Sequence, residues 1–177
     1  MILDTTFDTL WDFERCYNFV CKWEGGLSLD PNDRGNWTLG EIGKGELKGT
    51  KYGISAMMYP LEDIKNMTLE RAKQITRRDY WDKNNCDQMP QSIVLGFFDM
   101  AFNSGERNCA KVLLRAVGME SEGSITPRAL DAIHKMDEQV LKTKFLGYRI
   151  LFLADIKTFN LYARGWMRRI AQQLIEE

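Results

Sequence analysis

The chain has 177 residues, of which 44% are hydrophobic, and it carries 24 basic and 25 acidic side chains. This length supports a compact domain with a hydrophobic core, and the balanced charge argues against a nucleic-acid-binding protein, which usually has a strong basic excess. The single histidine, His134, excludes a histidine-rich zinc site and lies in an ordinary helical segment. We therefore expect no metal, no cofactor and no catalytic histidine.

The N-terminal region predicts a helix that ends next to a glutamate. Hydrophobic side chains recur at three- and four-residue steps over residues 6–23, and Glu24 continues the same apolar stripe. Gly25 and Gly26 predict the end of this helix, because glycine readily adopts the left-handed conformation. Burial and the negative end of a helix both disfavour an ionised carboxylate. We therefore expect a raised pKa for Glu24 and a role as the proton donor that cleavage of a glycosidic bond requires; the alternative is a solvent-facing glutamate in a turn.

Residues 27–55 are rich in Gly, Asp and Asn and contain short alternating runs, which predict turns and a small β-hairpin. Asp33 is a candidate for holding the attacking water or stabilising positive charge on the sugar; alternatively it forms an Asx turn before Gly35. Thr50 either positions the same water or begins a strand. Tyr52 either stacks on a sugar ring or packs in the core.

The rest of the chain predicts helices over residues 68–80, 90–105, 108–117, 126–135, 137–157 and 159–174. Trp81 follows the first of these and is either a sugar-stacking residue or a core residue. Asp99 and Asn103 lie one helical turn apart on an otherwise apolar helix. We expect them to line a binding cleft, with a helix cap as the alternative for Asn103.

The last predicted helix carries a basic patch of Arg164, Arg168 and Arg169. A solvated face is the simplest interpretation, and contact with an anionic wall or lipid is the alternative. The four cysteines form no CxxC pair, and we expect four thiols.

The chain contains no internal repeat, no low-complexity run and no linker. We expect residues 1–177 to form a single compact unit. Within it, residues 1–88 are expected to form the catalytic part, and residues 89–177 a helical C-terminal part. The N-terminal residues lack a basic region followed by an apolar run, so we expect no signal peptide. No apolar stretch is long enough to predict stable membrane insertion.

Five motifs occur in order along the chain. They are Trp-Glu-Gly-Gly-Leu-Ser-Leu-Asp-Pro-Asn-Asp-Arg-Gly at 23–35, Gly-Thr-Lys-Tyr-Gly-Ile-Ser at 49–55, Asp-Tyr-Trp at 79–81, Asp-Met-Ala-Phe-Asn-Ser-Gly at 99–105 and Gly-Trp-Met-Arg-Arg at 165–169. Each alone is weak, but together they closely resemble glycoside hydrolase family 108, whose members are N-acetylmuramidases of phages and bacteria. The resemblance implies a mainly α (α+β), lysozyme-like helical domain with a small β-hairpin near residues 27–55.

The resemblance assigns the catalytic role to Glu24 and implies hydrolysis of the bond between N-acetylmuramic acid and N-acetylglucosamine in peptidoglycan. Two alternatives stay open: a lytic transglycosylase that uses the same glutamate, and a non-catalytic wall-binding protein. Residues 36–48 separate the first motif from the second, whereas shorter members of the family join these two motifs directly. Either Thr38 or Thr50 can therefore align with the family threonine, and the residues after Thr50 favour Thr50. The stretch at 122–127 matches the family's peptidoglycan-binding region only loosely.

The implied partners and location follow from the same resemblance. We expect bacterial peptidoglycan as the substrate and a holin as a functional partner for release, with no direct binding to the holin. We expect synthesis in the bacterial cytoplasm, action in the periplasm after release, no nucleic-acid partner and a monomeric state.

Overall fold

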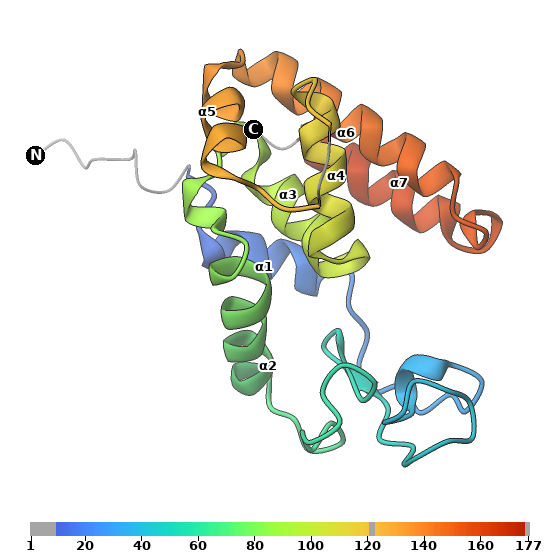
Figure 1. Cartoon of the computed structure of the whole chain (residues 1–177). Helices are drawn as coiled ribbons and strands as arrows, with labels where there is room; N and C mark the ends of the chain where they lie inside the picture. The colour runs from blue at the N-terminus through green and yellow to red at the C-terminus, as the bar shows by residue number, and fades with distance from the viewer. Residues whose placement is uncertain (1–9, 121–122, 176–177) are drawn as a thin grey trace, which may run out of the picture. The chain divides into compact units, whose positions relative to one another are not determined.

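The computed structural model describes residues 10–120 and 123–175. The predicted mainly helical fold with a small β-hairpin is confirmed (Figure 1). The chain forms two compact units, one made of residues 1–16 and 79–177 and the other of residues 17–78. We call these unit 1 and unit 2. The predictions that the chain acts as one unit and that residues 1–88 carry catalysis stay predictions.

Unit 1 is built from helices that pack against the buried helix α3 (Gln91–Ser104). Its other elements are the 3₁₀ helix η4 (Cys86–Gln88) and the helices α4 (Glu106–Ala116), α5 (Pro127–Lys135), α6 (Glu138–Ala154) and α7 (Phe159–Ile175). Helices α4, α6 and α7 each contact α3, and α6 also packs against α4 and α7 (Figure 1). The helix starts follow the expected chemistry, since the side chains of Thr126 and Asp137 cap α5 and α6.

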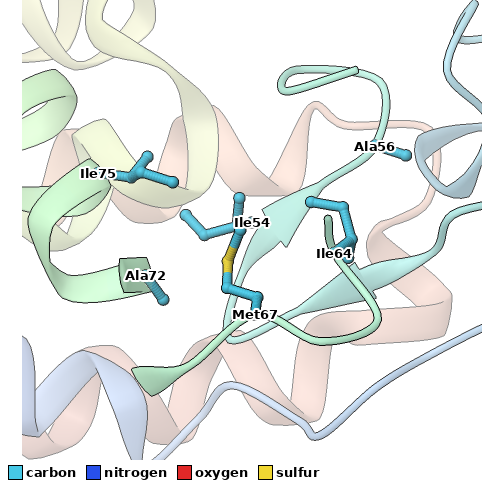
Figure 2. Packing of buried hydrophobic residues seen from close by; sticks show 6 residues of the cluster. All are labelled: Ile54, Ala56, Ile64, Met67, Ala72 and Ile75. Atoms are coloured by element: carbon cyan, nitrogen blue, oxygen red, sulfur yellow. The ribbon is translucent and has the colours of Figure 1, made fainter. Parts of the chain in front are cut away.

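Unit 2 contains the β region and one helix. A two-residue strand β1 (Thr50–Lys51) pairs with β2 (Ile54–Ser55) in antiparallel register, and the 3₁₀ helix η2 (Arg34–Asn36) precedes them. Helix α2 (Leu69–Thr76) begins at Thr68, whose hydroxyl accepts a hydrogen bond from the Arg71 N–H. Figure 2 shows how this helix and the hairpin share a small core of Ile54, Ala56, Ile64, Met67, Ala72 and Ile75.

The largest differences from the predicted helix boundaries occur at the start of the first helix and at the end of the second. Helix α1 (Phe13–Cys21) begins at Phe13 because the carboxylate of Asp12 accepts a hydrogen bond from the Arg15 N–H at 2.9 Å. The expected start near residue 6 lies outside the described residues. The helix predicted over 68–80 ends as α2 at Thr76 and continues as a six-residue π-helix, η3 (Arg77–Asp82). Trp81 therefore lies in a π turn, a feature often found at functional sites.

Candidate active site

Glu24 lies just beyond the C-terminal end of α1. The chain turns tightly after Cys21, where the Trp23 N–H donates to the Val20 carbonyl at 3.0 Å and the Glu24 N–H donates to the Cys21 carbonyl at 3.2 Å. Glu24 is half-buried, whereas the two glycines that follow it are exposed. The predicted position of the acid at the end of the first helix is therefore approximately correct.

Gly25 and Gly26 act differently from the sequence prediction. Neither adopts a positive φ, so the left-handed conformation does not end the helix. A Cβ atom added at either position would meet no heavy atom within 4 Å. Their contribution is open space in the chain directly after Glu24, because they carry no side chain and no neighbouring atom fills that space.

The segment after the glycines is held in place by the hairpin. Ser28 and Thr50 form an isolated antiparallel bridge, in which the Ser28 N–H donates to the Thr50 carbonyl at 2.8 Å and the Thr50 N–H donates to the Ser28 carbonyl at 3.0 Å. Gly49 has a φ of +91°, and a Cβ atom there would lie 2.4 Å from the Ser28 carbonyl oxygen. Only glycine permits this approach. The contact fixes the position of Ser28, a few residues after Glu24, relative to Thr50.

The fully buried side chain of Asn36 organises the same region. Its amide nitrogen donates to the Asp30 carbonyl at 3.0 Å, and its Oδ1 accepts a 2.7 Å hydrogen bond from the Thr50 hydroxyl. Its own carbonyl accepts from the N–H groups of Lys48 and Gly49. Asn36 thus ties the turn after Glu24 to the strand that carries Thr50. Its role could not be predicted from the sequence, since the only signal is one asparagine in a loop rich in Gly, Asp and Asn.

The Thr50 hydroxyl has a defined direction because of this contact. Its single hydrogen is used by Asn36, so its remaining hydrogen-bonding capacity is that of an acceptor. As an acceptor, it can receive a hydrogen bond from a water molecule and so orient that water. The other candidate threonine, Thr38, is used within its own loop, where its hydroxyl accepts from the Glu46 N–H at 2.9 Å.

Asp33 is exposed and caps the 3₁₀ helix η2. One of its carboxylate oxygens accepts a hydrogen bond from the Gly35 N–H at 2.8 Å, which is the Asx turn that the sequence offered as the alternative. The cap uses one carboxylate oxygen of Asp33 and leaves the second, so the water-holding role of Asp33 stays a prediction.

Tyr52 occupies the tip of the hairpin with a φ of +52°, followed by Gly53 at +76°. Two successive positive φ angles define the type I′ turn that matches the twist of paired strands. Such a conformation is unusual for a bulky residue and is held in place by the surrounding structure. The half-buried ring packs against the unit 2 core, and the Lys51 ammonium lies 5.3 Å from its centroid. Sugar stacking by Tyr52 stays a prediction.

Trp81 belongs to the core of unit 1. Its side chain is 1% exposed and makes edge-to-face contacts with Phe13 and Phe98, at centroid distances of 5.5 and 5.3 Å. Its indole N–H donates to Asp87 at 2.9 Å. A ring buried in this way has no free face for a sugar, so we omit Trp81 from the proposed site.

Asp99 is also fully buried, at the centre of a charged network in unit 1. Its two oxygens pair with the guanidinium groups of Arg149 and Arg169, at 2.6 and 2.5 Å, and Oδ2 accepts from the Gln173 amide at 2.7 Å. Burial alone would raise the pKa of Asp99, but the two arginines hold it below its usual value. The network joins α3, α6 and α7, and it gives Asp99 a structural role.

This network also changes the interpretation of the basic patch. Arg164 and Arg168 are exposed, as expected for a solvated face, whereas Arg169 is buried and paired with Asp99. Helical periodicity explains the difference, because Arg169 lies on the face of α7 that includes Ile170 and Gln173.

Asn103 is the exposed member of the predicted pair on α3. Its amide nitrogen donates to the Asp99 carbonyl at 2.8 Å and approaches the Asp99 carboxylate at 3.3 Å. The side chain therefore remains available at the surface through its carbonyl oxygen. Contact of Asn103 with a sugar stays a prediction.

The described residues give no indication of a metal centre or a membrane span. Within 10–120 and 123–175, no three His, Cys, Asp or Glu side chains are placed to hold a metal ion. No helix in the same ranges is long and apolar enough to cross a bilayer. None of the four cysteines, all of which are described, forms a disulfide.

Comparison with known proteins agrees with the motifs. The model of the family described as glycosyl hydrolase 108 matches residues 17–105, which are half of the chain and include Glu24, Asp33, Thr50 and Asn103. Among solved structures, the chain is similar to SagA of Brucella abortus, with 25% identity, a TM-score of 0.75 and coverage of 91% of this chain and 90% of that one. No protein with a curated description matches.

Proposed function

The chain belongs to glycosyl hydrolase family 108, and from this premise we propose that it is a muramidase. The proposed reaction is hydrolysis of the bond between N-acetylmuramic acid and N-acetylglucosamine in bacterial peptidoglycan. The observation that carries the proposal is the placement of Glu24, half-buried at the end of α1 beside two unobstructed glycines and inside the family match. The similarity to SagA over most of both chains supports the fold on which this assignment rests.

In the proposed mechanism, Glu24 donates its proton to the glycosidic oxygen as the bond to the sugar breaks. A water molecule then supplies the oxygen that the anomeric carbon gains, and its proton passes to the Asp33 carboxylate or to the Glu24 carboxylate that the first step leaves. The Thr50 hydroxyl donates its hydrogen bond to Asn36, so its oxygen is left to accept a hydrogen bond from this water and orient it. The free oxygen of Asp33 either accepts a hydrogen bond from the same water or stabilises the positive charge on the sugar ring.

Two other functions remain as alternatives. A lytic transglycosylase would use Glu24 in the same way but close an anhydro ring instead of admitting water. A non-catalytic wall-binding protein would need no acid, and membership of a glycosidase family argues against it. The Thr50 hydroxyl oxygen is left as an acceptor that can hold a water molecule. This favours hydrolysis, since a transglycosylase uses no attacking water.

Mass spectrometry of the released fragments tests the proposal. Purified peptidoglycan is digested with the protein, and the ends of the glycan fragments are measured. Hydrolysis gives reducing ends, whereas a transglycosylase gives fragments that are lighter by one water molecule. Anhydro ends would replace the proposal with the first alternative, and undigested peptidoglycan would support the second.

We propose further that the protein is made in the bacterial cytoplasm and reaches periplasmic peptidoglycan after release, with a holin as a functional partner. Four cysteines without a disulfide support synthesis in a reducing compartment. Expression of the chain alone in a Gram-negative host should leave the cells intact, and permeabilising the inner membrane should trigger lysis. Rapid lysis on expression alone would refute this part of the proposal.

A further inference from the structure

We propose that the outer face of α7 holds the protein on the surface of an anionic lipid bilayer, an inference that goes beyond the proposed function. This face is a stripe of four exposed side chains, Leu161, Arg164, Arg168 and Ile175, which we call the outer stripe. Leu161, Arg168 and Ile175 recur every seven residues, which is nearly two helical turns, and Arg164 lies one turn from both Leu161 and Arg168. The opposite side of α7 carries its buried residues and packs against α6 and α3 (Figure 1).

The outer stripe has a positive charge that no described carboxylate neutralises. Arg164 and Arg168 are exposed, and neither has an ion-pair partner among the described residues. Helix α7 contains no Asp or Glu, and its third arginine, Arg169, pairs with Asp99 inside unit 1. Two guanidinium groups one helical turn apart therefore face the solvent, and they favour a partner with negative charge.

Large aliphatic side chains stand at both ends of the outer stripe. Leu161 is 76% exposed and Ile175 is 78% exposed, and the two lie about 21 Å apart along the helix axis with the arginines between them. Their neighbours Tyr162 and Leu174, which are 57% and 47% exposed, extend the apolar surface at each end. Removing such side chains from water is favourable. The partner must therefore offer apolar groups as well as anionic ones.

The surface of an anionic bilayer offers both kinds of group in one plane. Its phosphate groups accept hydrogen bonds from guanidinium groups, and the acyl boundary just beneath them takes up aliphatic side chains. The stems of the arginines can lie along this boundary while their charged ends reach the phosphates. The contact is peripheral, because only one face of α7 is free and no helix in 10–120 or 123–175 is long and apolar enough to cross a bilayer.

A second copy of the chain fits the outer stripe less well. A twofold axis that places Leu161 of one copy against Ile175 of the other also brings the two Arg168 side chains together. Helix α7 has no acidic residue to separate these charges. Because like charges placed opposite each other are unfavourable, charge complementarity favours an anionic surface over self-association.

Flotation with lipid vesicles tests the proposal on the full chain. One set of vesicles contains phosphatidylcholine alone, and the other contains phosphatidylcholine mixed with phosphatidylglycerol. We expect binding to the mixed vesicles at low salt, far weaker binding to the neutral ones, and release at high salt, which screens exposed charges. Equal binding to both sets, or binding to neither, would overturn the inference. Retention on immobilised polyglutamate without binding to vesicles would also overturn it and would indicate an acidic protein as the partner.

Two double variants separate the charged and the apolar parts of the outer stripe. Arg164→Gln with Arg168→Gln should weaken binding to the mixed vesicles about 25-fold, since each basic side chain near an anionic surface strengthens binding about fivefold. Leu161→Ser with Ile175→Ser keeps both charges and should weaken binding about tenfold, because the aliphatic contacts with the acyl boundary are lost.

The matched control is Lys111→Gln with Arg128→Gln, which removes the same charge from exposed positions on α4 and α5. It should bind nearly as the parent protein does. All the substituted side chains are exposed, so each variant should keep the parental melting temperature. Undiminished binding by either folded stripe variant, or an equal loss in the control, would refute the proposed face. No peptidoglycan is present in the assay, so its outcome is independent of the muramidase proposal.

Discussion

The Thr50 hydroxyl donates a 2.7 Å hydrogen bond to the Oδ1 atom of Asn36, a side chain with no exposed surface. This contact joins the strand that carries a predicted catalytic residue to the turn that follows the predicted acid. It gives Asn36 two roles, one in stability and one in the orientation of the Thr50 hydroxyl, and the two can be measured separately.

Replacing Asn36 with alanine should lower the free energy of unfolding by about 3 kcal/mol, because it leaves the Thr50 hydroxyl and the Asp30 carbonyl without their partner. Turnover of peptidoglycan by the folded fraction should also fall, with kcat affected more than KM. Urea unfolding and initial rates of turbidity loss measure the two effects. Thr50→Val is the companion variant, and a double variant no worse than Asn36→Ala would confirm that the residues act together. Full turnover in both single variants would remove Thr50 from the mechanism.

Gly49 and Gly26 both lie in unit 2 but differ in the space around them, so their alanine variants can be compared. Gly49→Ala places a Cβ atom 2.4 Å from the Ser28 carbonyl at a φ of +91°, so it should destabilise the protein by about 2 kcal/mol or more. Gly26→Ala meets nothing within 4 Å, and we expect it to leave the melting temperature almost unchanged. Thermal unfolding followed by circular dichroism compares them. Equal melting temperatures for the two variants would mean that the Ser28–Thr50 bridge does not constrain the fold.

Asp99 should control stability at acidic pH. Its pKa is held below that of the unfolded chain, so its contribution is fully present above about pH 4 and is lost as the pH falls through the lower folded value. Asp99→Asn leaves two buried arginines without their carboxylate and should cost about 3–5 kcal/mol at neutral pH. The difference from the parent protein should shrink in urea titrations below about pH 4. A difference that stays constant down to pH 2 would contradict the ion-pair network.

The cysteines should differ in reactivity. Burial raises the pKa of both the Cys16 and Cys109 thiols, so these groups stay protonated and unreactive near neutral pH. Cys86 is buried as well, whereas Cys21 is only half-buried. Alkylation of the native protein followed by mass spectrometry should therefore label Cys21 first, and reducing agent should leave the melting temperature unchanged. A fall in melting temperature on reduction would reveal a disulfide.

Much of the helical fold could be predicted from the sequence, because caps and periodicity are local signals. Thr126 before Pro127, for example, predicts the start of α5 correctly. The π-helix that contains Trp81 was missed, since a change from four- to five-residue hydrogen bonding leaves no periodic signal over six residues. Three-residue spacing alone would place Leu69 on the same helix face as Ala72, yet Leu69 is 52% exposed, because it lies in the first turn of α2, away from the unit 2 core.

The candidate site was only partly predictable, for a related reason. Asp99 and Trp81 belong to recognisable motifs, but a motif does not distinguish a side chain that contacts substrate from one that holds the fold. Both are buried by partners distant in sequence, such as Arg149 and Phe13. Asn36, in contrast, belongs to the candidate site but was not predicted. Its contact with Thr50 spans fourteen positions and has no sequence signature.

The proton-donor role of Glu24 is the central claim, and the most direct measurement is the lytic rate of Glu24→Gln on outer-membrane-stripped cells. The amide keeps the shape of the side chain but cannot donate an acidic proton, so we expect a loss of about 10²- to 10⁴-fold with an unchanged melting temperature. Glu41→Gln, at an exposed glutamate of unit 2, is the control and should lyse normally. Near-parental lysis by folded Glu24→Gln would contradict the account.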